Sequence, residues 1–202
     1  MTNALHILKR IKRDQQGATL MEFAFVAPVF CLMLMGGMDI GYGIYVRAIS
    51  SGTLETAARK GSLEGATPSQ IRADIRTAIY KILPKSTRTT SNVVISTKSY
   101  TDYSRIDAAE KITVDVNSNG VVESGDCWVD EDGNNQYGTN EGLDGMGGAD
   151  DSVYYVVDIN LKKMFPFYKM VNMPETQTLT VKTLVINQPY ASQAVRPQVC
   201  KP

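Results

Sequence analysis

The residues with the clearest chemistry are side-chain oxygens spaced along one polar stretch of the chain. Counted from Asp115, these oxygens fall at places 1, 3, 5, 9 and 12, and Gly120 stands at place 6. In a calcium-binding loop alternate oxygens point inward at this spacing, and a glycine at place 6 permits the sharp turn. The predicted ligands are Asp115, Asn117, Asn119, Glu123 and Asp126. The last ligand is Asp rather than the usual Glu, which weakens the expectation of bidentate closure.

A second copy of the pattern begins fifteen residues later and is weaker. Its predicted ligands, at places 1, 3, 5 and 12, are Asp130, Asp132, Asn134 and Glu141. Asn135 replaces the glycine, and asparagine tolerates the left-handed conformation. The alternative for both stretches is a solvated acidic turn, because Asp, Asn and Gly are ordinary turn residues. Outside a cell, calcium would fill even a site with a Kd of about 10⁻⁴–10⁻³ M.

The three cysteines fall into two groups. Cys31 lies in an apolar run, where a thiol packs as a small apolar side chain. Cys127 and Cys200 lie in polar sequence, and in an exported domain both would face an oxidising compartment. A Cys127–Cys200 disulfide would tie the C-terminal tail to the central loop, and two free thiols are the alternative.

Composition excludes several other kinds of chemistry. The only histidine is His6, in a basic N-terminal leader, so the rest of the chain has no imidazole for Ser/His/Asp or Cys/His catalysis. No acidic pair stands at a recognisable catalytic spacing, and we do not expect an enzyme. The formal net charge is zero, which gives no electrostatic case for nucleic acid as a partner.

Four predicted strands flank the polar stretch, two before it and two after it, and would fix its position in the fold. Each is rich in β-branched residues or alternates apolar and polar residues. The predicted strands are residues 92–100, 111–116, 152–161 and 177–186. No helix separates the last three, so we expect an antiparallel sheet of about four strands. The polar residues 117–151 then form a long loop between the second strand and the third.

A helix is predicted ahead of these strands. Thr67 and Pro68 are typical of a helix start, and Pro84 ends the pattern. The apolar residues Ile71, Ile75, Ala78, Ile79 and Ile82 recur at helical spacing. This amphipathic helix should pack on the sheet, which gives an α+β fold.

The longest apolar run, residues 18–38, predicts a membrane-spanning helix. It contains one charge, Glu22, and at about 1.5 Å per residue it matches a hydrocarbon core of about 30 Å. The basic residues Lys9, Arg10, Lys12 and Arg13 precede it. They favour a cytoplasmic N-terminus by the positive-inside bias. A cleaved secretory signal is the alternative, but this run is too long and residues 36–41 match its cleavage pattern poorly.

These observations divide the chain into three parts. Residues 1–17 form a basic cytoplasmic leader, and residues 18–63 form the transmembrane helix with an extracytoplasmic extension. Residues 64–202 form an extracytoplasmic α+β domain that contains the long loop.

The start of the apolar run carries a more specific motif. Residues 17–28 read Gly-Ala-Thr-Leu-Met-Glu-Phe-Ala-Phe-Val-Ala-Pro after the basic leader. They resemble the class III signal of type IV pilins and, more narrowly, the opening of TadE-like proteins, minor pseudopilins of the tight-adherence (Tad, or Flp-type) pilus. Residues 184–190, which end in Asn-Gln-Pro-Tyr, are similar to that family's closing strand, although this match is weaker.

The resemblance implies a pilin-like fold and a set of functional residues. A prepilin peptidase would cut between Gly17 and Ala18. Glu22, the fifth residue of the mature chain, would then act in assembly by pairing with a neighbouring subunit's N-terminal amine. Burial of that ion pair is favourable only if its geometry is good.

The resemblance also implies a role in the assembly of Tad/Flp pili and in adherence. The implied partners are the cytoplasmic membrane, the prepilin peptidase, the major pilin, other pseudopilins and the pilus platform proteins. The implied location is the bacterial cytoplasmic membrane, crossed once, with the C-terminal domain periplasmic or extracellular. The alternative function is an uncleaved, membrane-anchored periplasmic domain that binds calcium or a surface ligand.

Overall fold

The computed structural model describes residues 16–139, 142–170, 172–193 and 195–202. Most of the predicted leader, with its basic residues and His6, lies outside the described residues. The chain forms two compact units. The first is Met1–Gly43 with Lys163–Glu175, and the second is Ile44–Lys162 with Thr176–Pro202.

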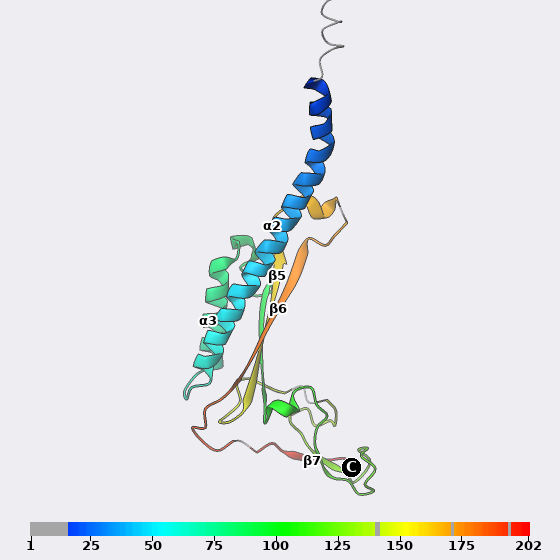
Figure 1. Cartoon of the computed structure of the whole chain (residues 1–202). Coiled ribbons are helices and arrows are strands. Elements are labelled where there is room, and N and C mark those ends of the chain that lie inside the picture. The colour runs from blue at the N-terminus through cyan, green and yellow to red at the C-terminus, as the bar shows by residue number, and fades with distance from the viewer. Residues whose placement is uncertain (1–15, 140–141, 171, 194) are drawn as a thin grey trace, which may run out of the picture. The chain divides into compact units, whose positions relative to one another are not determined.

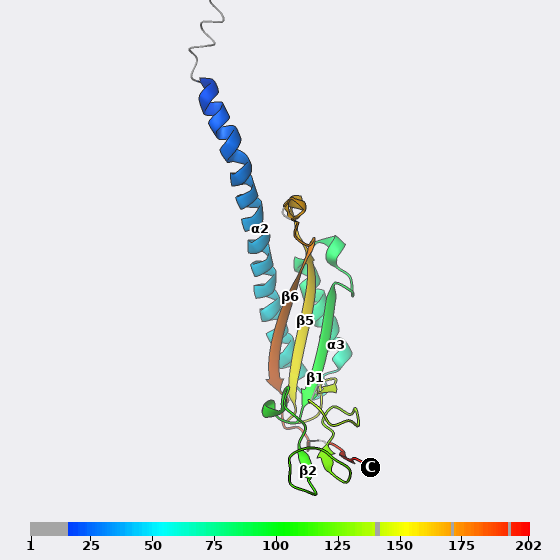
Figure 2. The same ribbon diagram turned by 90° about the vertical axis from the view of Figure 1, so that its right-hand side faces the viewer.

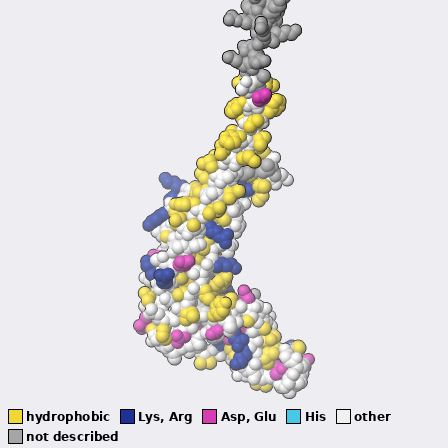
Figure 3. Space-filling model, viewed as in Figure 1, with side chains coloured by type: hydrophobic (Ala, Val, Ile, Leu, Met, Phe, Trp, Pro, Cys, Tyr) yellow, Lys and Arg dark blue, Asp and Glu magenta, His cyan; other side chains and the backbone are white. Residues whose placement is uncertain are grey.

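A single long helix, α2, covers Gln16–Gly61 and contributes to both units. The helix continues through Pro28, as membrane helices can when the freed backbone groups are satisfied elsewhere. Its first part exposes large apolar side chains, including Leu20, Phe23, Phe25 and Met33. Figure 3 shows hydrophobic side chains covering this N-terminal part of the surface. By length and composition the helix could cross a membrane.

The second unit is built on a four-stranded antiparallel sheet with the order β4-β1-β5-β6. Its strands are β1 (Val93–Tyr100), β4 (Leu143–Asp144), β5 (Ser152–Lys162) and β6 (Thr176–Ile186). Strand β5 buries every second side chain from Val153 to Leu161, which is the period of a strand with one face in the core.

Two helical segments run alongside this sheet (Figures 1 and 2). Helix α3 covers Pro68–Ile82 and buries Ile71, Ile75 and Ile79, the stripe predicted from their spacing. Thr67 takes the N-cap position, but its side chain makes no capping hydrogen bond. The later part of α2 adds apolar side chains to the core, among them Val46 and Leu54. The structure confirms the predicted α+β class with a long N-terminal helix, a second helix and antiparallel sheet.

A second, smaller sheet has the order β2-β3-β7 and is also antiparallel. Its strands are β2 (Ile112–Val114), β3 (Cys127–Val129) and β7 (Gln198–Cys200). It corrects one detail of the prediction, because residues 111–116 were expected beside the other three predicted strands. The edge of β1 is instead occupied by β4, where Lys98 and Asp144 form an ion pair of 3.1 Å.

The remaining short elements are 3₁₀ helices. They are η1 (Lys85–Thr87), η2 (Tyr103–Arg105) and η3 (Pro166–Lys169). The polar residues 117–151, predicted as one loop, thus contain β3 and β4.

Candidate functional sites

The N-terminal motif lies at the start of α2. The described part of α2 starts with Gln16, so the peptide bond between Gly17 and Ala18 lies within its first described residues. Glu22 follows Ala18 by four residues, one helical turn, and its side chain is exposed among exposed apolar neighbours such as Met21 and Phe23. The structure therefore presents one carboxylate on an apolar helix surface, within one turn of the residue that cleavage would make the N-terminus.

The polar stretch forms two loops, which we call the first acidic loop (residues 115–126) and the second acidic loop (residues 130–139). Places are counted from Asp115 in the first loop and from Asp130 in the second. The predicted ligand Glu141 would be place 12 of the second loop, and it lies outside the described residues.

In the first acidic loop, early side-chain oxygens hold the loop's own backbone. Asp115 accepts hydrogen bonds from the backbone N–H groups of Asn119 (3.2 Å) and Gly120 (2.8 Å). Asn117 accepts one from the N–H of Asn119 (3.3 Å), and Asn119 accepts one from the N–H of Val121 (2.7 Å). Places 1, 3 and 5 thus bond to the backbone at places 5, 6 and 7.

The second acidic loop repeats this pattern. Asp130 accepts hydrogen bonds from the backbone N–H groups of Asn134 and Asn135, each at 3.1 Å. Asp132 accepts from the N–H of Asn134 (3.0 Å), and Asn134 accepts from the N–H of Gln136 (2.5 Å). The two stretches that share a sequence spacing therefore share a backbone arrangement.

The backbone angles agree with this equivalence. At place 6, Gly120 has φ +75° and Asn135 has φ +59°. At place 4, Ser118 has φ +56° and Gly133 has φ +78°. Both loops therefore adopt the left-handed conformation at places 4 and 6, and Asn135 adopts it where the first loop uses glycine.

The closing residue of the first acidic loop, Asp126, is almost fully buried, with 1% of its surface exposed. Its two oxygens accept backbone hydrogen bonds from Val116 and Glu123, each at 2.8 Å. These two bonds, with a smaller contribution from Lys201, hold the pKa of Asp126 below its ordinary value. Asp126 thus stays ionised and clamps the two ends of the loop together.

The other late residue of the first loop is Glu123, at place 9. It is exposed, and its carboxylate accepts a hydrogen bond from the side-chain amide of Asn117 (2.8 Å). Hydrogen bonds thus involve all five predicted ligands of this loop, but the carboxylates that converge among the described residues lie elsewhere.

The second acidic loop receives a carboxylate from outside its own sequence. Three carboxylates converge here, and one oxygen of each lies within 4.8 Å of the other two. They belong to Glu110, Asp130 and Asp132. Glu110 is 3% exposed and accepts backbone hydrogen bonds from Glu131 (2.8 Å) and Gly138 (3.3 Å). Burial, followed by the charges of Asp132 and Asp130, raises the pKa of Glu110. Oxygen ligands of this kind suit a hard divalent cation such as calcium.

Glu110 was missed in the sequence because it stands twenty residues before Asp130. The signal that could have found it is the register of two short strands. Ile112 of β2 pairs with Trp128 of β3, so two residues further along the antiparallel pair Glu110 comes opposite Asp130. Strands of three residues carry too little local pattern to predict that register.

Strand β7 braces both loops. The Cys127–Cys200 disulfide, the pair predicted from the sequence, joins β3 to β7 with an S–S distance of 2.07 Å. Beside it, the Lys201 N–H donates to the Asp126 carbonyl at the end of the first loop (2.9 Å). The Asp130 N–H at the start of the second loop donates to the Pro197 carbonyl (2.9 Å). The C-terminal strand therefore fixes the junction between the loops.

Trp128 anchors the same junction from within. It lies in β3, directly after Cys127, and 4% of it is exposed. Its ring meets that of Tyr137, in the second acidic loop, edge to face with the ring centroids 6.0 Å apart. This contact attaches the second loop to the smaller sheet.

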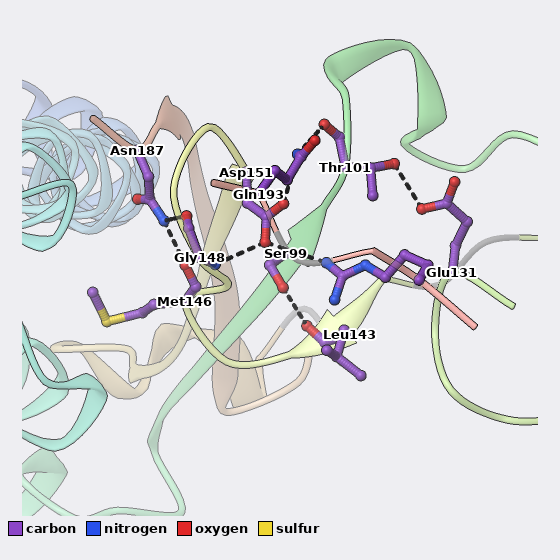
Figure 4. Close-up of polar contacts among 10 residues, drawn as sticks. Ser99, Thr101, Glu131, Leu143, Met146, Gly148, Asp151, Asn187 and Gln193 are labelled. Atoms are coloured by element: carbon purple, nitrogen blue, oxygen red, sulfur yellow. Dashed lines mark hydrogen bonds and ion pairs between the residues drawn. The ribbon is translucent and has the colours of Figure 1, made fainter. Parts of the chain in front are cut away.

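A buried polar network joins the C-terminal tail to the end of the main sheet (Figure 4). At its centre is Asp151, which is fully buried and accepts hydrogen bonds from the Gly148 N–H and the Gln193 side chain, each at 2.8 Å. Arg196 adds an ion pair to Asp151 of 3.3 Å. An almost fully buried charge needs such partners, and this network gives Asp151 a structural role.

Asn187 extends this network. Its side-chain amide donates to the carbonyls of Met146 and Gly148, each at 2.7 Å, and so holds the loop between β4 and β5. Asn187 belongs to the Asn-Gln-Pro-Tyr ending that resembled the TadE-like closing strand. In this chain its hydrogen bonds hold the Gly-rich turn between β4 and β5 in place.

Together these features define an α+β protein with one candidate membrane helix and a small disulfide-linked sheet carrying two acidic loops. Residues 17–62 match the family model described as TadE-like protein. The match begins at Gly17 and covers less than half of the chain, and it confirms the resemblance read from the N-terminal motif. The family and the candidate membrane helix fit a membrane protein associated with Tad pili. No curated protein and no solved structure gives a significant match.

Proposed function

We propose that this protein is a pseudopilin-like subunit that acts in the assembly of Tad/Flp pili after cleavage between Gly17 and Ala18. The observation that carries the proposal is Glu22, a single carboxylate on the apolar helix surface within the stretch that matches the family. A carboxylate inside lipid is costly, so it needs a partner there. The amine of a processed neighbouring subunit would supply one.

The residue before the proposed cleavage site supports this proposal. A peptidase needs an extended backbone at the bond that it cuts, and glycine at position 17 lowers the helical preference there.

The first test measures the intact mass and the N-terminus of the protein extracted from membranes, with and without a prepilin peptidase. We expect an N-terminus at Ala18 only when the peptidase is present. A leader retained in both samples would contradict processing and would favour the uncleaved, membrane-anchored domain.

The second test substitutes the assembly residue. We expect Glu22→Ala and Glu22→Gln to reduce recovery of the subunit with pili or the assembly complex, while processing continues. Glu55→Gln is the matched control, since Glu55 is an exposed glutamate further along the same helix. Normal assembly by both Glu22 variants would reject the assembly role.

A second candidate function is calcium binding at the acidic loops, and the convergence of three carboxylates at Glu110 favours the second loop. Glu110 and Asp130 are buried, and one oxygen of each lies within 4.8 Å of an oxygen of Asp132. A divalent ion would offset their repulsion and bind the neighbouring oxygens. The first loop is the weaker site in this proposal, because the carboxylates that converge among the described residues are Glu110, Asp130 and Asp132, none of which belongs to it.

Calcium titration of the full chain in detergent tests this function by thermal unfolding. A site with a Kd of about 10⁻⁴ M would add about 1.4 kcal/mol at ~1 mM calcium, or roughly 3–6 °C in Tm. We expect Asp130→Asn to abolish this shift and Asp144→Asn, at an exposed acid outside the loops, to retain it. No shift in the unmodified protein at ~1 mM calcium would reject the site.

A further inference from the structure

The segment Lys163–Glu175 connects β5 to β6 and forms one compact unit with the first part of α2. The Lys163 N–H donates to the Glu175 carbonyl (3.0 Å) and the Met173 N–H donates to the Tyr168 carbonyl (2.9 Å). The Met164 N–H donates to the carboxylate of Asp39 in α2 (2.9 Å). The segment, which we call the 163–175 loop, is thus closed on itself and tied to the helix.

The surface of the 163–175 loop is unusually apolar for a connection between strands. Met164, Met170 and Met173 are 56%, 75% and 53% exposed. Met38 and Ile40 of α2, on either side of Asp39, are also more than half exposed. Several large apolar side chains exposed on one short segment and on the helix turn to which it is tied are typical of a surface that something apolar covers.

The loop also carries positive charge beside this apolar surface. The Nζ atoms of Lys163 and Lys169 each lie 6.0 Å from the centroid of the Tyr168 ring. Methionines next to a tyrosine and two lysines are the composition of a segment at a membrane–water interface. There the apolar groups enter the acyl boundary and the cations meet anionic headgroups.

The tie to Asp39 fixes the loop at the corresponding level of the helix. Asp39 is the first charged residue after the apolar run 18–38, so in a membrane it would lie where the span ends. A loop held at Asp39 therefore lies beside the outer end of the span, next to the lipid headgroups.

We propose that the 163–175 loop inserts into the outer interface of the bilayer, with Met164, Met170 and Met173 in the acyl boundary and Lys163 and Lys169 on the phosphates of anionic lipids. The inference rests on the part of the proposed function in which α2 spans the membrane. It gives the protein a second, lipid-dependent membrane contact far along the chain from its helix.

The test places an environment-sensitive fluorophore on single cysteines of the full chain, reconstituted in bilayers with or without anionic phosphatidylglycerol. Met170→Cys reports on the loop, in a Cys31→Ser background. Val116→Cys is the matched control, because Val116 is 70% exposed but lies in the first acidic loop, which an anionic surface repels. Cys31 of the unmodified chain, labelled separately, reports on the span.

We expect the Met170→Cys label to be protected from aqueous iodide and quenched by lipid-borne quenchers, more strongly in anionic bilayers, while the Val116→Cys label stays in water. Each lysine near an anionic surface strengthens association about fivefold. Lys163→Gln together with Lys169→Gln should therefore lower the preference for anionic bilayers by a factor on the order of twenty.

Three results would overturn the inference. A Met170→Cys label in water in both bilayers, with the Cys31 label in lipid, would reject the loop contact and leave the span intact. A Met170→Cys label protected only when pilin subunits are added would make the loop a protein contact. A Cys31 label in water would reject both the span and the loop contact.

Discussion

The first and second acidic loops have the same hydrogen bonds at places 1, 3 and 5. They differ in the carboxylate that closes each loop, because its surroundings lower its pKa in the first loop and raise it in the second. Asp126 closes the first loop on two backbone N–H groups, which lower its pKa. Glu110 reaches the second loop from outside and comes next to Asp130 and Asp132, and its pKa is raised. The first loop is therefore closed by a carboxylate on backbone donors, whereas the second brings three carboxylates close to one another.

This difference is why the proposed calcium site is the second loop. The sequence favours the first loop, because it has glycine at place 6 and five oxygens at the expected spacing. Among the described residues, however, the three carboxylates that converge in three dimensions lie at the second loop. Spacing along the chain predicts how a loop turns, and neighbours far away in the sequence decide how much charge it holds.

Removing the disulfide should affect both loops and has the largest expected effect. Cys127 and Cys200 are 73 residues apart, so the loop-entropy model gives a loss of about 4 kcal/mol for Cys127→Ser with Cys200→Ser. Urea unfolding checks this value, and Cys31→Ser is the control. If the variant kept its stability, β7 would not be what braces the loops.

Asp126→Asn should break the first loop and leave the second intact. The substitution turns one of two acceptors into a donor that faces a backbone N–H, so the clamp between Val116 and Glu123 is lost. Hydrogen exchange should show faster exchange at those two amides and unchanged protection at Asn134 and Asn135. Equal loss of protection in both loops would mean that they fold as one unit.

Glu110→Gln should act on the second loop alone, and the size of its effect should depend on calcium. Without divalent ions the variant should lose less stability than Asp126→Asn, because the loss of one backbone acceptor is offset by the removal of a buried charge beside Asp130 and Asp132. With ~1 mM calcium it should lose the stabilisation of about 1.4 kcal/mol expected of the site. Thermal unfolding in calcium and in a chelator measures both, and an unchanged calcium shift would remove Glu110 from the site.

In calcium-free protein, lowering the pH should change the stability of the two loops in opposite directions. The raised pKa of Glu110 means that its contribution to stability is present below its ordinary pKa of 4.5 and is lost as pH rises through the folded value. The lowered pKa of Asp126 means that its contribution is present above 3.8 and is lost as pH falls through the folded value. Amide exchange measured from neutral to acidic pH should show the second loop tightening first and the first loop opening last.

The smallest expected effect is that of a substitution at place 6 of the first acidic loop, Gly120. An added Cβ at Gly120 meets no atom within 4 Å, so a substitution there tests the left-handed backbone alone. Gly120→Ala should cost about 1 kcal/mol and Gly120→Asn roughly 0.5 kcal/mol, because asparagine already holds this conformation at Asn135. Equal costs in urea unfolding would contradict the equivalence of the two loops.

Much of the fold could be predicted because its signals are local. The apolar run predicts α2, the isoleucine spacing predicts α3, and residues 152–161 and 177–186 nearly match β5 and β6. The same holds for the turns of the acidic loops, whose hydrogen bonds join residues at most five apart.

What could not be predicted depends on pairing between distant short segments. Strand β4 has two residues and β2, β3 and β7 have three each, so none has a pattern that selects its partner. The place of residues 112–114 in the smaller sheet and the position of Glu110 both follow from this pairing. The sequence shows the methionines of the 163–175 loop, but neither their exposure nor the tie of the loop to Asp39 could be predicted from it.

The position of β7 in the chain has a consequence for the order of events during export. Both acidic loops are braced by residues 197–201, whereas α2 is the first element of the described chain. A chain that is exported in the order of its sequence, with its N-terminus kept in the cytoplasm, would insert α2 early. It would finish the smaller sheet only after β7 has crossed the membrane. The acidic loops would then be the last part to mature, so their closure would report that translocation is complete.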